Sequence, residues 1–189
     1  MPVVPHEPDR REVWTREATD YALQEGLIGL SLRPLAASLG TSDRMLLYHF
    51  GTKDDLVAAI LRESNDRAVD GIGAMPPSED LHAAVHDLWS ALGSPALEPC
   101  TRVYVEAAAL GLLGREPYAT VVRQANEVWA KALVAHLTRS GVARPLARRA
   151  ATIIDAAFMG FQLDAPLVGP AARRRAVGDL ADAVAALAG

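Results

Sequence analysis

The stretch SLRPLAASLGTSDRMLLYHFGTKDD, residues 31–55, decides the fold of this chain. Ser31 is suited to the N-cap of a helix, and apolar residues recur at spacings of three and four from Leu32 to Leu39. Gly40 then supplies the backbone freedom that ends a helix sharply. The first half of the stretch therefore predicts a short amphipathic helix and a tight glycine turn.

A second short helix is predicted directly after this turn. Ser42 can cap it, and Met45, Leu46 and Phe50 can turn to one apolar side. Helix, glycine turn and helix make up a helix-turn-helix, whose second helix can enter a DNA major groove. Because many pairs of core helices share this arrangement, it becomes a specific signal only together with the residues on its C-terminal side.

A third helix is predicted to begin after Thr52. Thr52 is its N-cap, and Asp55 can reach back as the capping-box partner. Lys53 then lies at a helix N-terminus, where the helix dipole favours anions over cations. A cation in this unfavourable place suggests a partner outside the chain, and a phosphate group fits.

Residues 10–62 contain a continuous series of short motifs. They are Ala18, Gly26, Ser31-Leu32-Arg33, Leu35-Ala36, Leu39-Gly40-Thr41-Ser42, Tyr48-His49-Phe50 and Lys53-Asp54-Asp55-Leu56. In this order and spacing the segment resembles the DNA-binding domain of the TetR family of transcriptional regulators. One departure is Leu47, because many members carry there a tyrosine that touches the DNA backbone. Other members carry two tyrosines in succession, so Tyr48 can do the work of the second.

The resemblance implies an all-α protein. Residues 1–51 are expected to form an N-terminal three-helix helix-turn-helix domain, and residues 52–189 a C-terminal helical effector-binding and dimerisation domain. The implied function is that of a sequence-specific DNA-binding transcriptional regulator, a repressor that a small apolar effector releases. No cofactor is implied.

A homodimer is also implied, because the family usually joins two such helices, here 118–139 and 146–163, across a two-fold axis. The small side chains of Ala156 and Gly160 allow close helix approach there. A two-fold dimer implies a palindromic double-stranded DNA operator with half-sites about 34–36 Å apart or a multiple of that spacing.

Composition favours helix over sheet and a cytoplasmic protein. Half of the 189 residues are apolar, with alanine and leucine dominant. No apolar run reaches the roughly twenty residues of a membrane span, and the first dozen residues lack the apolar stretch of a signal peptide. The single cysteine, Cys100, excludes an internal disulfide framework, and a core position is expected for it.

Charge does not favour DNA binding. The chain carries a net charge of −4, and residues 1–66 hold seven Lys and Arg against eleven Asp and Glu. A nucleic-acid-binding domain is expected to show a basic patch. Binding would therefore depend on dimerisation and helix-end contacts, and a patch would have to come from few residues: Arg10, Arg11, Arg33, Arg44 and Lys53.

The rest of the chain is predicted to be helical. Predicted helices span 10–25, 52–69, 79–92, 97–113, 118–139, 146–163 and 171–187. Residues 71–78 contain two glycines and two prolines and predict a loop, with Ser78 capping the next helix. The 97–113 segment is apolar on nearly every side, which predicts a helix buried all round.

Arg44 is the candidate for base contacts in the second helix of the helix-turn-helix. A guanidinium pairs bidentately with guanine O6 and N7, although a phosphate contact or a pair with Asp43 is equally open. Arg33 is a further DNA-binding candidate in the basic patch, and His49 can instead pack at the helix end. The candidates for phosphate contacts are Thr41, Ser42, Tyr48, His49 and Lys53.

An effector pocket is implied by the resemblance alone, because each candidate is first of all a core residue. The candidates are Trp89, Tyr104, Glu106, Trp129, Phe158 and Phe161. Glu106 lies among apolar neighbours, and an unpaired buried carboxylate is costly. It therefore needs a partner, for which Arg102, Arg123 or a ligand would serve.

No enzyme or metal chemistry is predicted. His82 and His86 have the spacing of a shared metal, but no third ligand is evident, so an exposed helix surface is favoured. The sequence has no phosphate loop and no serine-nucleophile elbow. The alternative to a DNA-binding regulator is a helical ligand-binding or interaction module that no longer binds DNA.

Overall fold

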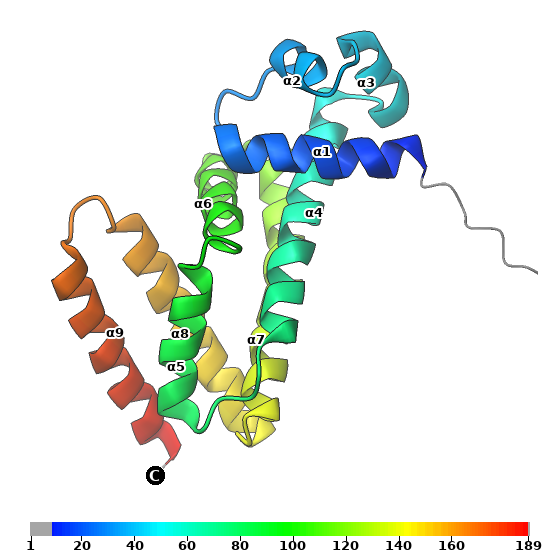
Figure 1. The fold of residues 1–189 in the computed structure, drawn as a ribbon. Helices are drawn as coiled ribbons and strands as arrows, with labels where there is room; N and C mark the ends of the chain where they lie inside the picture. Colours follow the sequence, from blue (N-terminus) through cyan, green and yellow to red (C-terminus); the bar gives the residue numbers. More distant parts are fainter. Residues whose placement is uncertain (1–8, 189) are drawn as a thin grey trace, which may run out of the picture. The chain divides into compact units, whose positions relative to one another are not determined.

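The computed structural model describes residues 9–188, and within this range the regular structure is entirely helical (Figure 1). The all-α prediction is confirmed. The elements are α1 (Arg10–Glu25), α2 (Leu32–Ser38), α3 (Asp43–Phe50), α4 (Lys53–Ala74), α5 (Leu81–Leu92), α6 (Glu98–Leu112), α7 (Tyr118–Arg139), α8 (Arg144–Leu163), α9 (Pro170–Ala185) and a final 3₁₀ turn (Ala186–Ala188).

Packing divides the chain into two compact units. The first consists of Met1–Ser64 with Arg102–Val122, and the second of Asn65–Thr101 with Arg123–Gly189. Helices α4, α6 and α7 therefore contribute residues to both units. The predicted division into residues 1–51 and 52–189 concerns function and stays a prediction.

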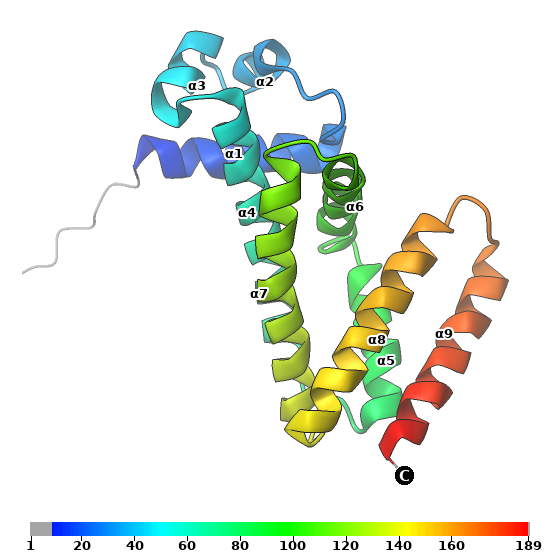
Figure 2. The ribbon, with the colours of Figure 1, turned by 180° about the vertical axis from the view of Figure 1, so that it is seen from behind.

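The core of the first unit joins the N-terminal helices to α6 and the start of α7. Helices α2 and α3 lie side by side over α1 (Figures 1 and 2). Trp14 of α1 is buried. Its neighbours in the core come from both parts of the sequence: Ala18, Ala22, Leu35, Leu46, Phe50, Leu56, Ile60, Val103, Ala107 and Val121.

The second unit buries the apolar faces of α5, α8 and α9 against the end of α7. Helix α9 packs on α5 and on α8 (Figure 2). The fully buried members of this core include Leu88, Leu133, Leu137, Ile154, Val177 and Val184. Among residues 9–188, none of the helices is long and apolar enough to cross a membrane.

Helix α4 continues past the predicted break, because Gly71 is required inside the helix and does not end it. A Cβ atom on Gly71 would lie 2.7 Å from Cδ2 of Leu97. The glycine therefore allows close approach of the Leu97 side chain, and the helix ends only at Ala74. The prediction of a helix ending near residue 69 was wrong for this reason.

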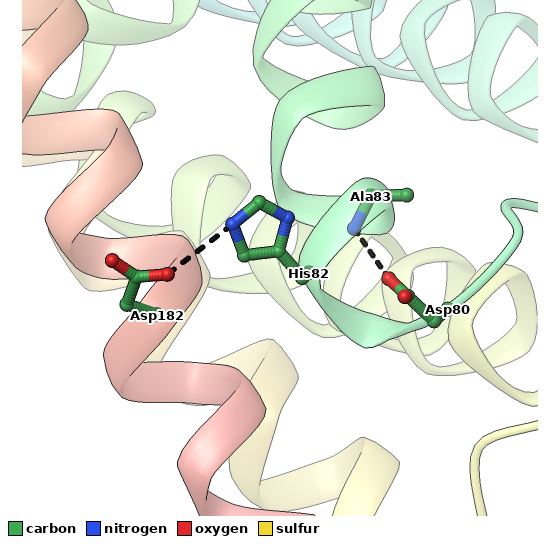
Figure 3. A network of polar contacts seen from close by, with 4 residues as sticks. All are labelled: Asp80, His82, Ala83 and Asp182. Carbon is green, nitrogen blue, oxygen red and sulfur yellow. Dashed lines mark hydrogen bonds and ion pairs between the residues drawn. The ribbon is translucent and has the colours of Figure 1, made fainter.

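The cap of α5 is Asp80 and not Ser78. The Asp80 carboxylate accepts a 2.7 Å hydrogen bond from the amide of Ala83 (Figure 3). Ser78 is buried instead, and its hydroxyl donates to Asp87 Oδ2 at 2.7 Å. The same hydroxyl oxygen lies 3.3 Å from Nε2 of His136 on α7.

His82 and His86 belong to the partly exposed side of α5. Their rings lie 5.0 Å apart, and Nε2 of His82 is 3.3 Å from the Asp182 carboxylate of α9 (Figure 3). Within the described part of the chain, no three side chains of the metal-ligating kinds come together. The contact between His82 and Asp182 connects α5 and α9, two helices of the second unit.

The end of α6 is exposed, contrary to the prediction of a helix buried on every side. Leu112 and Leu113 expose 90% and 72% of their surface. At Gly111 the helix approaches the start of α7, since a Cβ there would lie 3.2 Å from the Cα of Ala119. This approach leaves the two leucines that follow outside the core. Cys100, near the start of α6, is buried as predicted.

Candidate nucleic-acid interface

The turn between α2 and α3 is built as the sequence predicts. Ser31 occupies the N-cap position of α2, although its side chain makes no capping hydrogen bond. Gly40 adopts a positive φ of 64°, and the amide of Thr41 donates to the carbonyl of Ala36 at 2.9 Å. Ser42 then caps α3, because its hydroxyl oxygen accepts from the amide of Met45 at 3.3 Å.

The capping box at the start of α4 is confirmed. The amide of Asp55 donates to the Thr52 hydroxyl at 3.1 Å, and the amide of Thr52 donates to Asp55 Oδ2 at 3.2 Å. Gly51, with φ of 89°, joins this box directly to the end of α3. Lys53 therefore begins a firmly capped helix one short turn after α3, with its side chain exposed.

Helix α3 presents four exposed side chains and buries two. Leu46 and Phe50 expose 0% and 4% of their surface and hold the helix on the core. Tyr48 is the most exposed of the large hydrophobic side chains of α3, at 79%. The inward position predicted for Met45 was wrong, because this side chain is 41% exposed. Arg44 and Leu47 complete the outer face.

Two arginines of α1 are held over aromatic rings of the helix-turn-helix core. The guanidinium of Arg10 lies 5.4 Å from the ring centre of Trp14, and that of Arg11 lies 5.5 Å from the ring centre of Phe50. Such cation–π contacts stabilise by about 0.5–1 kcal/mol at exposed sites. They keep two cations near the end of α3 within the same unit.

His49 packs between two aromatic rings. Its ring meets Trp14 edge to face at 4.9 Å and Tyr48 edge to face at 5.2 Å. The side chain is half-buried, so the structure favours the packing role that the sequence left open.

The basic patch depends on side chains that are exposed within the first unit, as the sequence requires. Thr41 is half-buried at the turn, and Ser42 is exposed. The cations predicted for this patch are all exposed: Arg10, Arg11, Arg33, Arg44 and Lys53. The other arginines of the first unit are exposed as well: Arg16, Arg62, Arg102 and Arg115.

Sequence analysis missed how α6 holds the end of α1. Arg102 donates to the carbonyls of Leu23 and Gln24, the latter at 3.3 Å. One carboxylate oxygen of Glu106 accepts from the amides of Leu27 and Ile28 at 2.5 and 2.8 Å. The partner of Glu106 is therefore neither Arg102 nor Arg123 but the backbone. The only sign of these contacts in the sequence was the presence of two charged residues, Arg102 and Glu106, four positions apart on an apolar helix.

The six candidates for an effector pocket divide between the two units. Tyr104 and Glu106 belong to the first unit, where Tyr104 is half-buried. In the second unit the ring of Trp89 meets Phe158 at 5.1 Å and Phe161 at 5.7 Å. Trp89, Phe158 and Phe161 thus form an aromatic cluster.

Trp129 is hydrogen-bonded to a half-buried carboxylate. Its indole N–H donates to Asp155 Oδ1 at 2.9 Å, which joins α7 to α8. Burial raises the pKa of Asp155 above its usual value, while the hydrogen bond from Trp129 opposes this shift. Asp155 also lies at the edge of a groove of about 1050 Å³ between α7 and α8, whose walls include Ala130, Val134, Thr152 and Ala156.

Comparisons with known proteins agree with the geometry of the first unit. Residues 16–60 match the family model described as "Bacterial regulatory proteins, tetR family". This range contains α2, α3 and both capping motifs. A search of curated proteins found no match.

Solved structures resemble the chain over nearly its whole length. A transcriptional regulator from Rhodococcus sp. Rha1 is 25% identical, with a TM-score of 0.73 over 93% of this chain and 95% of that one. The multidrug binding protein EbrR, complexed with proflavin, is also 25% identical, with a TM-score of 0.67 over 91% and 98%. A TetR transcriptional regulator from Legionella pneumophila shares the fold at 17% identity, with a TM-score of 0.70 over 95% and 99%.

The family match covers the capped helix-turn-helix, and the structural matches also cover the helices that follow it. Both kinds of comparison place the chain among regulators rather than enzymes. Together with the exposed outer face of α3, they identify the protein as a member of the TetR family of DNA-binding transcriptional regulators.

Proposed function

We propose that the protein is a cytoplasmic, homodimeric repressor that binds a palindromic operator and is released by a small apolar effector. The observation that carries the DNA-binding part is the outer face of α3, which lies between two capped helix starts and is accompanied by exposed cations. The N-terminal residues of a recognition helix contact base edges, and the residues around it contact phosphates.

Arg44 is proposed to contact a base, and Arg33, Lys53 and the N-terminal end of α3 are proposed to contact phosphates. Arg44 is exposed one turn before Tyr48, on the side away from the core. Thr41 and Ser42 lie at the N-terminus of α3, where amides and the helix dipole favour anions. His49 contributes by orienting Tyr48.

The homodimer is proposed to form through α7 and α8. This face exposes apolar and small residues that a single chain leaves uncovered: Val128 and Ile153 are 42% and 41% exposed, and Ala156 and Gly160 are exposed as well. The groove between the two helices can receive side chains of a second copy. A two-fold dimer would present two copies of α3 to a palindrome.

Effector release is proposed on two grounds. The related EbrR is described as a multidrug binding protein complexed with proflavin or imidazole. In this chain the cluster of Trp89, Phe158 and Phe161 offers aromatic surface to an apolar ligand. Such a ligand releases the operator only if it binds the released state more tightly than the DNA-bound state.

The test is fluorescence anisotropy of the full chain against DNA fragments selected from genomic DNA, at several salt concentrations. We expect tight binding to a palindromic fragment that weakens as salt rises, because phosphate binding releases counterions. Arg44→Ala should weaken binding by about 1–3 kcal/mol. Arg174→Ala, which removes an exposed arginine of α9, is the matched control and should bind like wild type.

Failure to select any fragment would favour the alternative, a helical ligand-binding or interaction module that no longer binds DNA. The dimer is tested separately by light scattering. Ile153→Glu should convert a dimer to a monomer, whereas a wild-type monomer would contradict the dimer proposal.

A further inference from the structure

The outer face of α3 is unusually apolar for a surface that contacts DNA. Met45 and Leu47 are 41% and 36% exposed, and Tyr48 is 79% exposed. Arg44 is the single charged side chain classed as exposed on this helix, among the residues that the structure describes. Three of the four side chains on the outer face thus have mainly apolar surface.

The core has no room for these side chains. Leu46 and Phe50 are already fully packed inward, and Tyr48 lies two residues from each of them, about 200° around the helix. Met45 and Leu47 lie on opposite flanks of Tyr48, since two residues on a helix are again about 200° apart. The two side chains would therefore meet different base pairs when α3 lies in a groove.

Only one base displays an apolar group in the major groove. Thymine carries a C5-methyl there, whereas guanine, adenine and cytosine offer hydrogen-bond donors and acceptors at the corresponding edge. Neither Met45 nor Leu47 carries a hydrogen-bond donor, so burial against a cytosine or a guanine would leave polar groups of the base unsatisfied.

We propose that Met45 and Leu47 determine operator specificity by contacting the methyl groups of two different thymines in each half-site. This proposal rests on the DNA-binding function. Arg44, between the two flanks, supplies the polar contact of the same face. The structure thus assigns an operator whose half-site holds two thymines that the protein recognises without hydrogen bonds.

The test removes single methyl groups from DNA. Starting from the tightest fragment in a random-library selection, each thymine in turn is replaced by deoxyuridine, which differs only in lacking the C5-methyl. Affinities are measured by anisotropy for wild type, Met45→Ala and Leu47→Ala. The matched control is Leu167→Ala, because Leu167 is an 82% exposed leucine of the second unit.

We expect wild type to lose affinity about fourfold at each of two positions in a half-site, the factor that corresponds to one buried methyl. Met45→Ala should abolish the loss at one position and Leu47→Ala at the other, while Leu167→Ala keeps both. Both replaced side chains are exposed, so the variants should retain the wild-type circular dichroism and thermal midpoint.

Tight wild-type binding that is equally strong with deoxyuridine at every position would overturn the proposal and leave DNA binding intact. Retention of both methyl effects in both variants would overturn it as well. Absence of any selected fragment would instead overturn the DNA-binding function together with this inference.

Discussion

Acid should destabilise this protein through His136, a histidine that the fold keeps neutral. The side chain has no exposed surface. The Ser78 hydroxyl donates to Asp87, so its oxygen is left to accept a hydrogen bond from the N–H at Nε2 of His136, 3.3 Å away. This arrangement requires the tautomer with hydrogen on Nε2. The other nitrogen, Nδ1, is buried and has no hydrogen-bond partner within residues 9–188.

Protonation would place a new N–H on Nδ1 where no acceptor lies, and a charge in a buried site. Burial accordingly lowers the pKa of His136 below its usual value, and Arg139 lowers it further, while Asp87 acts in the opposite direction. The unfolded chain therefore takes up a proton near pH 6.5 that the folded chain does not bind, and stability falls as pH decreases below that value.

The size of the effect follows from this difference. If the folded chain binds no proton at His136, the free energy of unfolding should fall by about 0.35 kcal/mol at pH 6.5 and about 1.4 kcal/mol at pH 5.5, relative to pH 7.5. Urea unfolding followed by circular dichroism at pH 7.5 and 5.5 measures it.

The comparison variant is His136→Gln, which keeps a polar group able to approach Ser78 but does not titrate. It should be less stable than wild type at pH 7.5 and should lack the acid-dependent loss that His136 causes. His86→Gln, at an exposed position of α5, is the control and should behave like wild type. An identical pH dependence in wild type and His136→Gln would refute the reasoning.

Three further predictions concern single contacts, each measured by urea unfolding. Glu106→Ala should destabilise the protein by about 2 kcal/mol, because two backbone amides lose a charged acceptor, and Glu106→Gln should recover part of this loss; equal stability of Glu106→Ala and wild type would contradict the contact. Asp155→Asn should become more stable relative to wild type as pH rises above about 3.8, because a carboxylate whose pKa is raised in the folded state loses stability on ionisation; a gap independent of pH would contradict this. Gly71→Ala should cost about 1–3 kcal/mol by overlap with Leu97, and much less in a Leu97→Ala background; strict additivity would show that no overlap exists.

Local chemistry made much of the helix-turn-helix predictable. The Ser42 cap and the Thr52–Asp55 capping box involve residues no more than three apart, so spacing alone determines them. The position of Gly40 likewise follows from its residue type and its place after an amphipathic helix. Such features need no knowledge of the rest of the fold.

The misses involve contacts between distant parts of the chain. Glu106 binds amides 78 and 79 residues away, which no local pattern can indicate. Gly71 resembles a helix terminator until Leu97 is known to lie against it. In the sequence Met45 resembles a core residue, because its position on α3 is compatible with either the inner or the outer face of the helix. In the structure Leu46 and Phe50 fill the core below α3, and the Met45 side chain is exposed. Which apolar residues stay exposed is decided by how much room the core has.

The first unit takes residues from two separate stretches of chain, and this limits how the protein can be rearranged by recombination. The same core contains Trp14 and Leu46 together with Val103, Ala107 and Val121, which come more than fifty residues after Leu46 in the sequence. A chimera that exchanged only the N-terminal segment with another regulator would set foreign helices against a native α6. Operator specificity should therefore be transferable only if the Arg102–Val122 segment moves with it, or if only the outer face of α3 is exchanged. Exchange of the N-terminal segment alone should therefore give a misfolded hybrid, whereas either of the other two exchanges should give a folded regulator with a new operator.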